Sequence, residues 1–478
     1  MKICMVVEGS YPYVTGGVSS WLQMLISLMP EHEFIVYSVA AEEKQRGCFK
    51  YEIPENVIEV KEVFLDSILH QSVQGLGKCE LSPQEAAAFE ALICGERNVR
   101  LQELLPLFQS GRAGKKRSGM AMNIFMSFSF FDVVQRAYQR QFGHLPFTDF
   151  FWTVRSMLLP LLYLLEQDLP EADVYHSVAA GYAGVIAMAG AAQHKKPFLL
   201  TEHGIYARER EEEIIQSSWA GDDFKGLWIN YFYSLAKLSY QEASKVLTLF
   251  RQNAEMEAYL GCDPAKIEVV PNGVNASRFA GTPGKRGDGR TVGAIVRVVP
   301  IKDIMTMLRA FALVRTECPE SRFFIIGPID ENEEYFEECQ NLAGSLGLSD
   351  VVFTGTVDVR EYLPKLDLLM LTSISEGQPL ALLEGMAAGK PFVCTDVGAC
   401  RELLLGEDGF GPAGYVVPML DAPALAQGVV KLLRDPKLRE EMGENGRRRV
   451  GEQYTRQRFI DRYRQVYEEV ASDGRNRL

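Results

Sequence analysis

The feature that most constrains the fold is a regular alternation of short apolar segments with amphipathic segments in the second half of the chain. The apolar segments predict strands at 291–297, 322–327, 351–354, 368–372 and 392–395. The segments between them predict helices at 303–316, 332–346, 359–364, 380–388 and 398–404. Short strands connected through helices form a parallel sheet covered on both faces, which is a doubly wound α/β domain.

The same alternation opens the chain and then breaks. A strand at 3–7, a turn at Thr15-Gly16-Gly17, a helix at 20–28 and a strand at 34–39 predict one βαβ unit. Further strands are predicted at 174–176, 198–201, 246–249 and 268–270. Helical patterns fill the interval from about 66 to 165, at 83–94, 99–108, 130–140 and 154–167. The first half therefore predicts another doubly wound domain, with a helical insertion.

A polar stretch rich in Gly and Pro, Gly281–Arg290, is the best linker candidate in the chain. A chain of 478 residues is also too long for one ordinary core. We predict a first domain at 1–281, with the helical insertion at about 66–165, and a second domain at 282–452. A charged amphipathic helix is predicted at 453–478.

Composition excludes several classes of function. The net charge of −13 disfavours a nucleic-acid-binding protein, and the basic run Lys115–Arg117 is interpreted as a solvated loop. Nine cysteines without CxxC spacing indicate neither a zinc site nor a disulfide framework, and they fit a reducing cytoplasm. No apolar run is long enough to span a bilayer, and the N-terminus is interpreted as a buried strand rather than a signal peptide.

The start of the helix predicted at 380–388 is a candidate anion site. Pro379 suits the first turn of a helix, because its missing N–H would have no partner there. The next three N–H groups are predicted to be free and to point out of the helix start, and they belong to Leu380, Ala381 and Leu382. The helix dipole favours an anion at the same place.

Two glutamates bracket this candidate anion site. Glu376 lies in the loop before the helix and Glu384 lies more than one turn into it. Such a pair suits a ligand with hydroxyls on both sides of a phosphate group, for example a sugar–diphosphate–ribose. Two glutamates eight residues apart are, however, more often a surface acid and a helix-favouring acid without a shared ligand.

Two cations strengthen the interpretation as a ligand site. Arg297 and Lys302 follow the strand at 291–297, so they are predicted to face the same edge of the sheet. Two cations beside a helix N-terminus form a diphosphate clamp, in which each charge-assisted bond contributes about 1.5–3 kcal/mol. The alternative is that both are ordinary surface charges.

The first half offers weaker candidates. Gly16 and Gly17 follow the first strand, where glycine lets the backbone approach a ligand closely, although a plain tight turn would have the same sequence. His203 follows the strand at 198–201 and lies among charged residues, so we favour a role in a ligand-binding or catalytic site over a structural role. Glu202 is a weaker candidate that could orient the His203 imidazole or contact the acceptor.

Taken together, these residues resemble those of the retaining glycosyltransferases of the GT-B fold, in the large family-4 group. That group is marked by E-x7-E, here Glu376 and Glu384, and by an Arg and Lys pair, here Arg297 and Lys302. Further similarity lies in Val270–Val274, in Gly355 and in Gly389–Val393. The resemblance covers about 1–60 and 170–470.

The resemblance implies a fold and a set of roles. Two Rossmann-like domains would face a cleft, and the C-terminal helix would cross back to the first domain. Glu376 would contact the donor sugar, Glu384 the ribose diol, and His203 the transferred sugar. The implied catalytic residues are Arg297, Lys302, Glu376 and His203. The implied donor-binding residues are Gly16, Gly17, Arg297, Lys302, Glu376, Gly377, Pro379, Leu380, Ala381 and Glu384.

The resemblance implies that the anomeric configuration of the transferred sugar is retained. Retention requires either a carboxylate nucleophile or attack on the front face, and the sequence identifies no nucleophile. We therefore predict that Arg297, Lys302 and the helix start offset the charge of the leaving diphosphate. No DxD metal cluster lies near these residues, so we predict that neither a metal nor another cofactor is required.

A narrower resemblance links the chain to the glycosyltransferases of Pel exopolysaccharide synthesis. It rests on Glu8–Pro12, on the helical insertion and on Thr201–Tyr206. It implies a cytoplasmic enzyme that moves a hexose or N-acetylhexosamine from a UDP-sugar to a growing polysaccharide. It also implies a membrane-embedded synthesis and export complex as partner, which would recruit the protein to the inner face of the membrane.

Two other functions remain possible for the same residues. A nucleotide-sugar 2-epimerase would cleave the same bond without a sugar acceptor. A non-catalytic scaffold of an export complex would bind the nucleotide sugar and leave it intact. A nicotinamide dehydrogenase is disfavoured, because no predicted strand is followed by GxGxxG with an acidic residue about 20 positions later.

Overall fold

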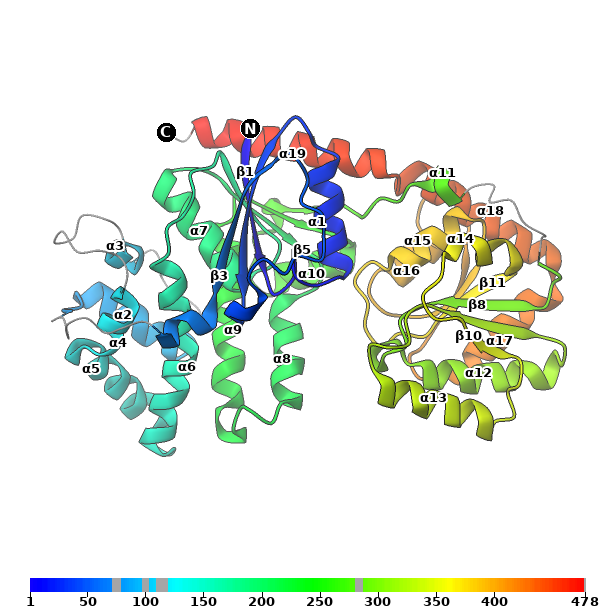
Figure 1. Ribbon diagram of the computed structural model, residues 1–478, viewed down its shortest axis with the longest axis horizontal. Helices are drawn as coiled ribbons and strands as arrows, with labels where there is room; N and C mark the ends of the chain where they lie inside the picture. Colours follow the sequence, from blue (N-terminus) through cyan, green and yellow to red (C-terminus); the bar gives the residue numbers. More distant parts are fainter. Residues whose placement is uncertain (71–78, 97–102, 109–118, 280–286, 477–478) are drawn as a thin grey trace. The chain divides into compact units, whose positions relative to one another are not determined.

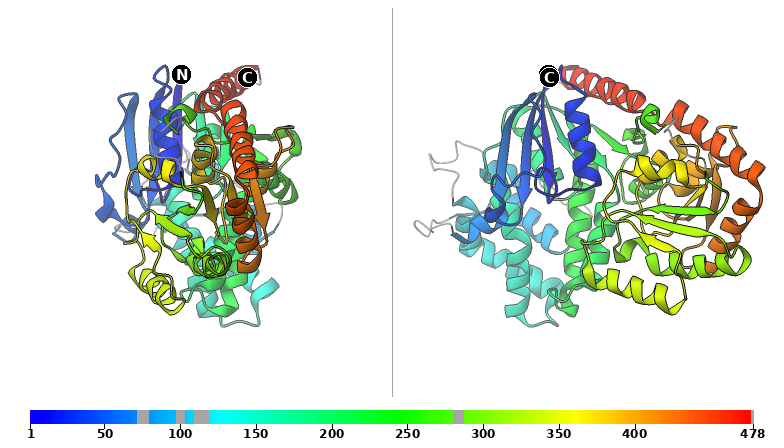
Figure 2. Two further views of the ribbon diagram at one scale, coloured as in Figure 1. Left: turned by 90° about the vertical axis from the view of Figure 1, so that its right-hand side faces the viewer. Right: turned by 45° about the vertical axis from the view of Figure 1, so that its right-hand side comes forward.

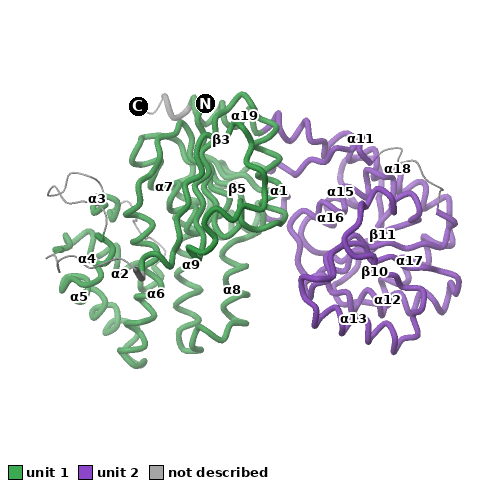
Figure 3. The backbone as a smooth tube through the Cα atoms, viewed as in Figure 1, with its two compact units in different colours: residues 1–248, 254–268, 463–478 green, residues 249–253, 269–462 purple. Residues whose placement is uncertain are grey.

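The computed structural model describes residues 1–70, 79–96, 103–108, 119–279 and 287–476. They form two compact units, which Figure 3 shows in different colours. Unit 1 comprises residues 1–248, 254–268 and 463–478, and unit 2 comprises residues 249–253 and 269–462. The predicted linker 281–290 lies outside the described residues up to 286, as do Lys115–Arg117. The predicted domain boundaries at 281 and 453 stay predictions.

Unit 1 contains a seven-stranded sheet in the order β3-β2-β1-β4-β5-β6-β7. Its strands are β1 (Lys2–Glu8), β2 (Glu33–Ala40), β3 (Val57–Phe64), β4 (Val174–Ser177), β5 (Phe198–Glu202), β6 (Lys245–Thr248) and β7 (Ile267–Val269). The strands from β3 to β6 pair in parallel. The prediction lacked β3, because this edge strand is largely half-buried and carries charged residues among its apolar ones.

The helices of unit 1 fall into two groups. Those that connect the strands are α1 (Gly17–Ser27), α7 (Tyr182–His194), α8 (Tyr206–Gln216), α9 (Asp222–Glu242) and α10 (Arg251–Tyr259). Those between β3 and β4 are α2 (Pro83–Ile93), α3 (Leu105–Phe108), α4 (Met120–Phe125), α5 (Phe128–Ala137) and α6 (Phe147–Leu165). Figure 1 shows this second group gathered in one region of the unit, next to α7 and α9. It occupies the interval in which helices were predicted, and residues 99–102 of the helix predicted at 99–108 lie outside the described part of the chain.

The C-terminal helix α19 (Arg456–Asn476) contributes two tyrosines to the core of unit 1. Tyr467 Oη lies 2.8 Å from Nδ1 of His176, and Nε2 of the same ring lies 2.8 Å from Oγ1 of Thr201. Tyr463 Oη lies 3.2 Å from that same Thr201 oxygen. Burial lowers the pKa of His176 to about 3, so the imidazole is neutral and acts as a structural link between α19 and the sheet.

Unit 2 contains a six-stranded parallel sheet in the order β10-β9-β8-β11-β12-β13. Its strands are β8 (Thr291–Ile295), β9 (Arg322–Ile326), β10 (Val351–Phe353), β11 (Leu368–Leu371), β12 (Phe392–Thr395) and β13 (Gly414–Val417). The first five confirm the predicted strands, and β13 was not predicted. The strand order reverses between β8 and β11, which is the switch point where open parallel sheets bind ligands.

The helices of unit 2 cover both faces of this sheet. They are α11 (Ala276–Phe279), α12 (Ile304–Glu317), α13 (Glu333–Ser345), α14 (Val359–Tyr362), α15 (Leu380–Ala387), α16 (Cys400–Leu405), α17 (Ala422–Arg434) and α18 (Pro436–Gln453). Helix α12 packs against α13 and α17, and α15 packs against α16 and α18. Figure 1 and Figure 2 show α12 and α13 side by side along the sheet of unit 2. In the described part of the chain, no helix combines the length and apolar character that crossing a membrane requires.

Candidate functional site

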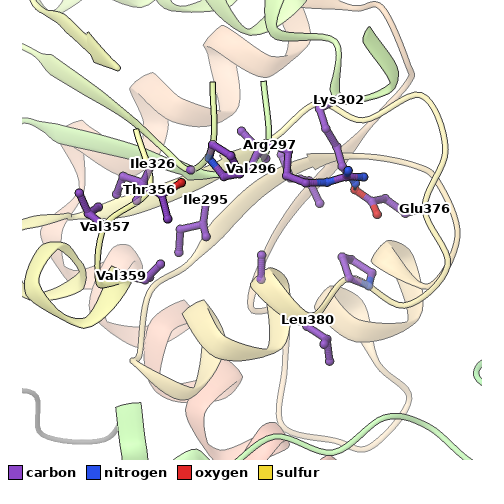
Figure 4. A pocket seen from close by; sticks show the side chains of 15 residues that line it. Ile295, Val296, Arg297, Lys302, Ile326, Thr356, Val357, Val359, Glu376 and Leu380 are labelled. Carbon is purple, nitrogen blue, oxygen red and sulfur yellow. The ribbon is translucent and has the colours of Figure 1, made fainter. Parts of the chain in front are cut away.

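A cavity of about 320 Å³ lies in unit 2 at the switch point. The loops that follow β8, β9, β10 and β11 line it together with the start of α15. Its lining residues are Ile295, Val296, Arg297, Lys302, Ile326, Gly327, Pro328, Thr356, Val357, Val359, Leu371, Glu376, Pro379, Leu380 and Ala381. Figure 4 shows Lys302 and Glu376 pointing toward each other at one end, with Val357 and Val359 at the other.

A close backbone approach shapes the rim of this cavity. Gly327 follows β9 with φ of 147°, and a Cβ atom there would lie 2.1 Å from the Val296 carbonyl oxygen. Its N–H donates to the carbonyl of Gly355, which follows β10, at 3.2 Å. Only glycine fits this position. Because Gly327 contacts both Val296 and Gly355, the loops after β8, β9 and β10 converge at Gly327.

Lys302 and Glu376 form the polar end of the cavity. Lys302 Nζ lies 2.6 Å from Glu376 Oε1, and the side chains are 16% and 10% exposed. Ser373 Oγ donates to the same oxygen at 2.5 Å. Thr372 Oγ1 donates to the Lys302 carbonyl at 2.9 Å, which ties the two loops together. The pair is therefore held in place by neighbouring loops, and the sequence prediction that both residues face one sheet edge agrees with this geometry.

Arg297 lines the same cavity in a more exposed setting. Its side chain is 52% exposed, and Nη1 lies 2.6 Å from a carboxylate oxygen of Glu331. An exposed pair of this kind contributes about 0–1 kcal/mol, so an anionic ligand could displace Glu331 at little cost.

The loop that carries Glu376 depends on Gly398. This glycine has φ of 51°, and a Cβ atom there would lie 2.2 Å from the Glu376 carbonyl oxygen. The N–H of Ala399 donates to the Gly377 carbonyl at 2.9 Å. Gly377 thus supports the site through its backbone. Neither Gly398 nor Ser373 was predicted from the sequence, and Gly398 is the third residue after β12, where no local pattern marks its contact with Glu376.

Helix α15 begins at Leu380, with Pro379 as its extended N-cap residue at φ −71° and ψ 116°. Leu380 and Ala381 line the cavity at the start of the helix. The prediction of three free N–H groups was wrong for Leu382, whose N–H donates to the Pro379 carbonyl at 3.1 Å. This bond forms because Pro379 lies just before the helix, where its carbonyl accepts the first bond of a tight initial turn.

Glu384 lies further along α15 and is not among the residues that line the cavity. Burial raises the pKa of Glu384, and the positive charge of Arg278 on α11 opposes that rise. Its assignment to a ribose diol stays a prediction.

His203 lines a separate cavity of about 250 Å³, formed within unit 1. Its ring contacts Trp21 edge-on, with 4.6 Å between the ring centroids. Burial lowers the pKa of His203 to about 4, so the imidazole is neutral at physiological pH. Glu202 does not orient this imidazole, because its carboxylate accepts from the N–H of Tyr206 at 3.2 Å and from the hydroxyl of Tyr240.

Gly16 and Gly17 also belong to unit 1, at the start of α1, and both are exposed. Apart from the neighbouring residues and the backbone of α1, no atom of the described residues lies within 4 Å of a Cβ built on either glycine, and φ of Gly16 is 175°, which is extended. The packing of unit 1 therefore does not require glycine here, and the predicted ligand contact stays a prediction. No group of three or more His, Cys, Asp or Glu side chains in the described ranges is placed to hold a metal ion.

Comparison with known families divides the chain near the predicted linker. Residues 1–265 match the family described as "Domain of unknown function (DUF3492)". Residues 278–449 match the family described as "Glycosyl transferases group 1". All the lining residues of the 320 Å³ cavity fall within the second match, and those of the 250 Å³ cavity fall within the first.

Two curated relatives resemble parts of the chain. An MMP alpha-(1->4)-mannosyltransferase of Mycolicibacterium hassiacum is 27% identical over 279 residues, which are 57% of this chain and 66% of the relative. An N-acetyl-alpha-D-glucosaminyl L-malate synthase of Bacillus anthracis is 32% identical over 178 residues, which are 37% of this chain and 44% of the relative. The chain thus spans less than two thirds of the length of either relative.

Two solved structures share the fold over nearly their whole length. A sucrose-phosphate synthase of Thermosynechococcus elongatus superposes with a TM-score of 0.62 at 16% identity, covering 99% of each chain. HepE of Anabaena in complex with UDP superposes with a TM-score of 0.60 at 15% identity, covering 98% of this chain and 100% of HepE. The two parallel sheets and these likenesses confirm the predicted GT-B fold. The chain belongs to the family described as "Domain of unknown function (DUF3492)", and on this GT-B fold its residues 278–449 are similar to the family described as "Glycosyl transferases group 1".

Proposed function

We propose that this protein is a retaining glycosyltransferase that moves a hexose or N-acetylhexosamine from a UDP-sugar to a growing exopolysaccharide, as PelF does in Pel synthesis. The observation that carries the proposal is the half-buried Lys302–Glu376 pair beside the start of α15, at the switch point of unit 2. The resemblance to the Pel enzymes lies in Glu8–Pro12 and Thr201–Tyr206. It extends the proposal to a cytoplasmic enzyme that acts together with a membrane-embedded export complex.

The cavity of unit 2 suits the three parts of a nucleotide sugar. Lys302, Arg297 and the start of α15 would bind the diphosphate, since they provide two cations and a helix N-terminus. Glu376 would accept a hydrogen bond from a sugar hydroxyl. The apolar lining residues Ile295, Val357 and Val359 would pack on the base and the ribose.

The chemistry follows from where charge develops in the reaction. The bond between the anomeric carbon and the diphosphate breaks while an acceptor hydroxyl oxygen bonds to the same face of that carbon. The proton of the acceptor hydroxyl passes to the leaving diphosphate, and Lys302 and Arg297 offset its negative charge. These groups supply the stabilisation that a metal ion supplies elsewhere, so the proposal includes no metal and no further cofactor.

UDP is proposed as the carrier because HepE, which shares the fold, has been solved with UDP and with UDP-glucose. Calorimetric titration of UDP, GDP and ADP into the purified protein tests this choice. We expect UDP to bind at least about tenfold more tightly than GDP or ADP, which corresponds to about 1.4 kcal/mol. Addition of EDTA is expected to leave the UDP affinity unchanged.

Tighter binding of GDP or ADP would contradict the proposed donor, and loss of UDP binding in EDTA would contradict the metal-free site. Incubation with the UDP-sugar separates the related activities. A transferase releases UDP in step with acceptor consumption, whereas a 2-epimerase would convert the donor with no acceptor present.

A further inference from the structure

The cavity of unit 1 lies wholly within the stretch that matches a domain of unknown function. It has a volume of about 250 Å³ and lies at the carboxyl ends of β1 and β5, beside α8. Its charged and polar lining residues, besides His203, are Glu8, Ser10, Glu202, Tyr206, Glu209 and Arg210. This position at the switch point of the sheet is where a ligand of unit 1 would bind.

Glu8 is held as an acceptor at the end of β1. Its carboxylate accepts from the hydroxyl of Tyr206 at 2.9 Å and from the N–H of Ala183, near the start of α7, at 3.3 Å. The side chain is 12% exposed. Burial raises the pKa of Glu8, and the nearby Arg210 guanidinium opposes that rise.

Glu209 and Glu202 add two more carboxylates to the wall. Glu209 folds back over Gly204, where a Cβ atom would lie 2.0 Å from Oε1. Burial raises the pKa of Glu209, and it raises the pKa of Glu202 to about 7. Both shifts have the same cause, which is that carboxylates have been removed from water with little positive charge to compensate them.

Arg210 is the one Lys or Arg among the lining residues that the structure describes, and it also forms an ion pair with Glu213. Its guanidinium lies 3.8 Å from Glu8 and 2.5 Å from Glu213. His203 is neutral, as its lowered pKa requires. Three lining carboxylates thus share a single cation, which is also paired with Glu213, so acidic groups outnumber basic ones in the described wall of the cavity.

Two buried polar atoms in this wall have no partner among the described residues. They are Oγ of Ser10 and Nε2 of His203. Buried polar atoms are nearly always hydrogen-bonded, so each of these atoms is suited to a hydroxyl of a bound ligand. The carboxylates of Glu8 and Glu209 can accept further hydrogen bonds from the same ligand.

We infer that this cavity selects the acceptor by charge: it binds a hydroxyl-rich sugar without negative charge and rejects one that carries a carboxylate or a phosphate. Hydroxyl groups of the acceptor donate to Glu8 and Glu209 and exchange hydrogen bonds with Ser10 and His203. This gives His203 a role toward the acceptor in place of the contact with the transferred sugar that the resemblance implied. An anionic sugar brings another negative charge beside these carboxylates, which costs affinity. The inference rests on the proposed function, because it assigns the acceptor to unit 1.

A pair of glycosides that differ only at C6 tests the inference on the full chain. They are p-nitrophenyl glucoside, with a hydroxymethyl group, and p-nitrophenyl glucuronide, with a carboxylate. Saturation-transfer NMR in the presence of UDP should show the glucoside bound at least about tenfold more tightly. In Glu209→Gln, which keeps the shape and removes the charge, the preference should fall about tenfold. Glu212→Gln removes the same charge from an exposed position of α8 that does not line the cavity, so it should keep the preference.

Equal binding of the two glycosides, stronger binding of the glucuronide, or binding of neither would overturn the inference. An unchanged preference in Glu209→Gln would do the same. Calorimetry with UDP separates this failure from that of the proposed function. If UDP binds and the charge preference is absent, only the acceptor inference fails, whereas absent UDP binding contradicts the proposed donor site itself.

Discussion

Lys302→Ala is expected to lower the rate of sugar transfer by about 10²–10³-fold, while UDP binding weakens by about tenfold or less. The reason is that Lys302 stabilises charge that develops as the diphosphate leaves, and this charge is larger in the transition state than in the bound donor. Its ammonium group lies inside the cavity, 2.6 Å from Glu376 Oε1, where little water competes with it. The measurement compares kcat for transfer with the calorimetric Kd of UDP.

Lys365→Ala is the matched control for this prediction. Lys365 is an exposed lysine of unit 2 that stacks on Tyr362 and does not line the cavity, so its loss should change neither quantity. If Lys302→Ala retained both donor hydrolysis and transfer at the wild-type rate, the role assigned to Lys302 would be wrong.

Arg449→Leu is expected to lower the free energy of unfolding of unit 2 by about 3–5 kcal/mol. Arg449 is fully buried and donates to Asp408 through Nε at 2.5 Å and through Nη2 at 3.0 Å. It also binds the last carbonyls of α16, those of Leu403, Leu404 and Leu405. The substitution takes the guanidinium from the Asp408 carboxylate, which keeps only the N–H of Phe410, and from the three carbonyls, of which Leu404 keeps the N–H of Ala413. Polar groups that lose a donor in a buried setting are costly.

The stability experiment can separate the two units. All four tryptophans, at positions 21, 152, 219 and 228, belong to unit 1, so their fluorescence follows unit 1 while far-UV circular dichroism follows both units. Arg449→Leu should shift the urea transition seen by circular dichroism. Arg447→Leu removes an exposed arginine two residues away, whose pair with Glu444 contributes at most about 1 kcal/mol. Equal shifts in the two variants would contradict the role of Arg449.

The strands and the main helices of unit 2 could be predicted from the sequence because the central strands β8, β11 and β12 are buried on both faces. Continuous apolar runs that alternate with amphipathic segments are typical of a parallel sheet covered by helices. The predicted placement of Lys302 and Glu376 at one edge of the sheet followed from the same rule, since the carboxyl ends of parallel strands lie at one edge, whereas their direct contact was not predicted. The edge strand β3 escaped prediction because its half-exposed face carries charges, and short β13 escaped as well.

Interactions between residues distant in the sequence could not be predicted. Gly398 is required by a contact with the Glu376 carbonyl, more than 20 residues away in the sequence, and no local pattern reveals this contact. Arg449 lies in a charged helix and resembles a surface residue until Asp408 and the end of α16 surround it. The carboxylates of the unit 1 cavity come from β1, β5 and α8, so only the fold shows that they share one wall.

The most direct test of the central claim is hydrogen–deuterium exchange of the full chain with and without UDP. The claim is that the cavity between Lys302, Glu376 and the start of α15 binds the nucleotide sugar. UDP should slow exchange in peptides covering 297–303 and 376–384, and it should leave peptides of the insertion helix α6 (Phe147–Leu165) unchanged. Protection absent from both of these segments, or confined to segments outside the cavity, would contradict the claim.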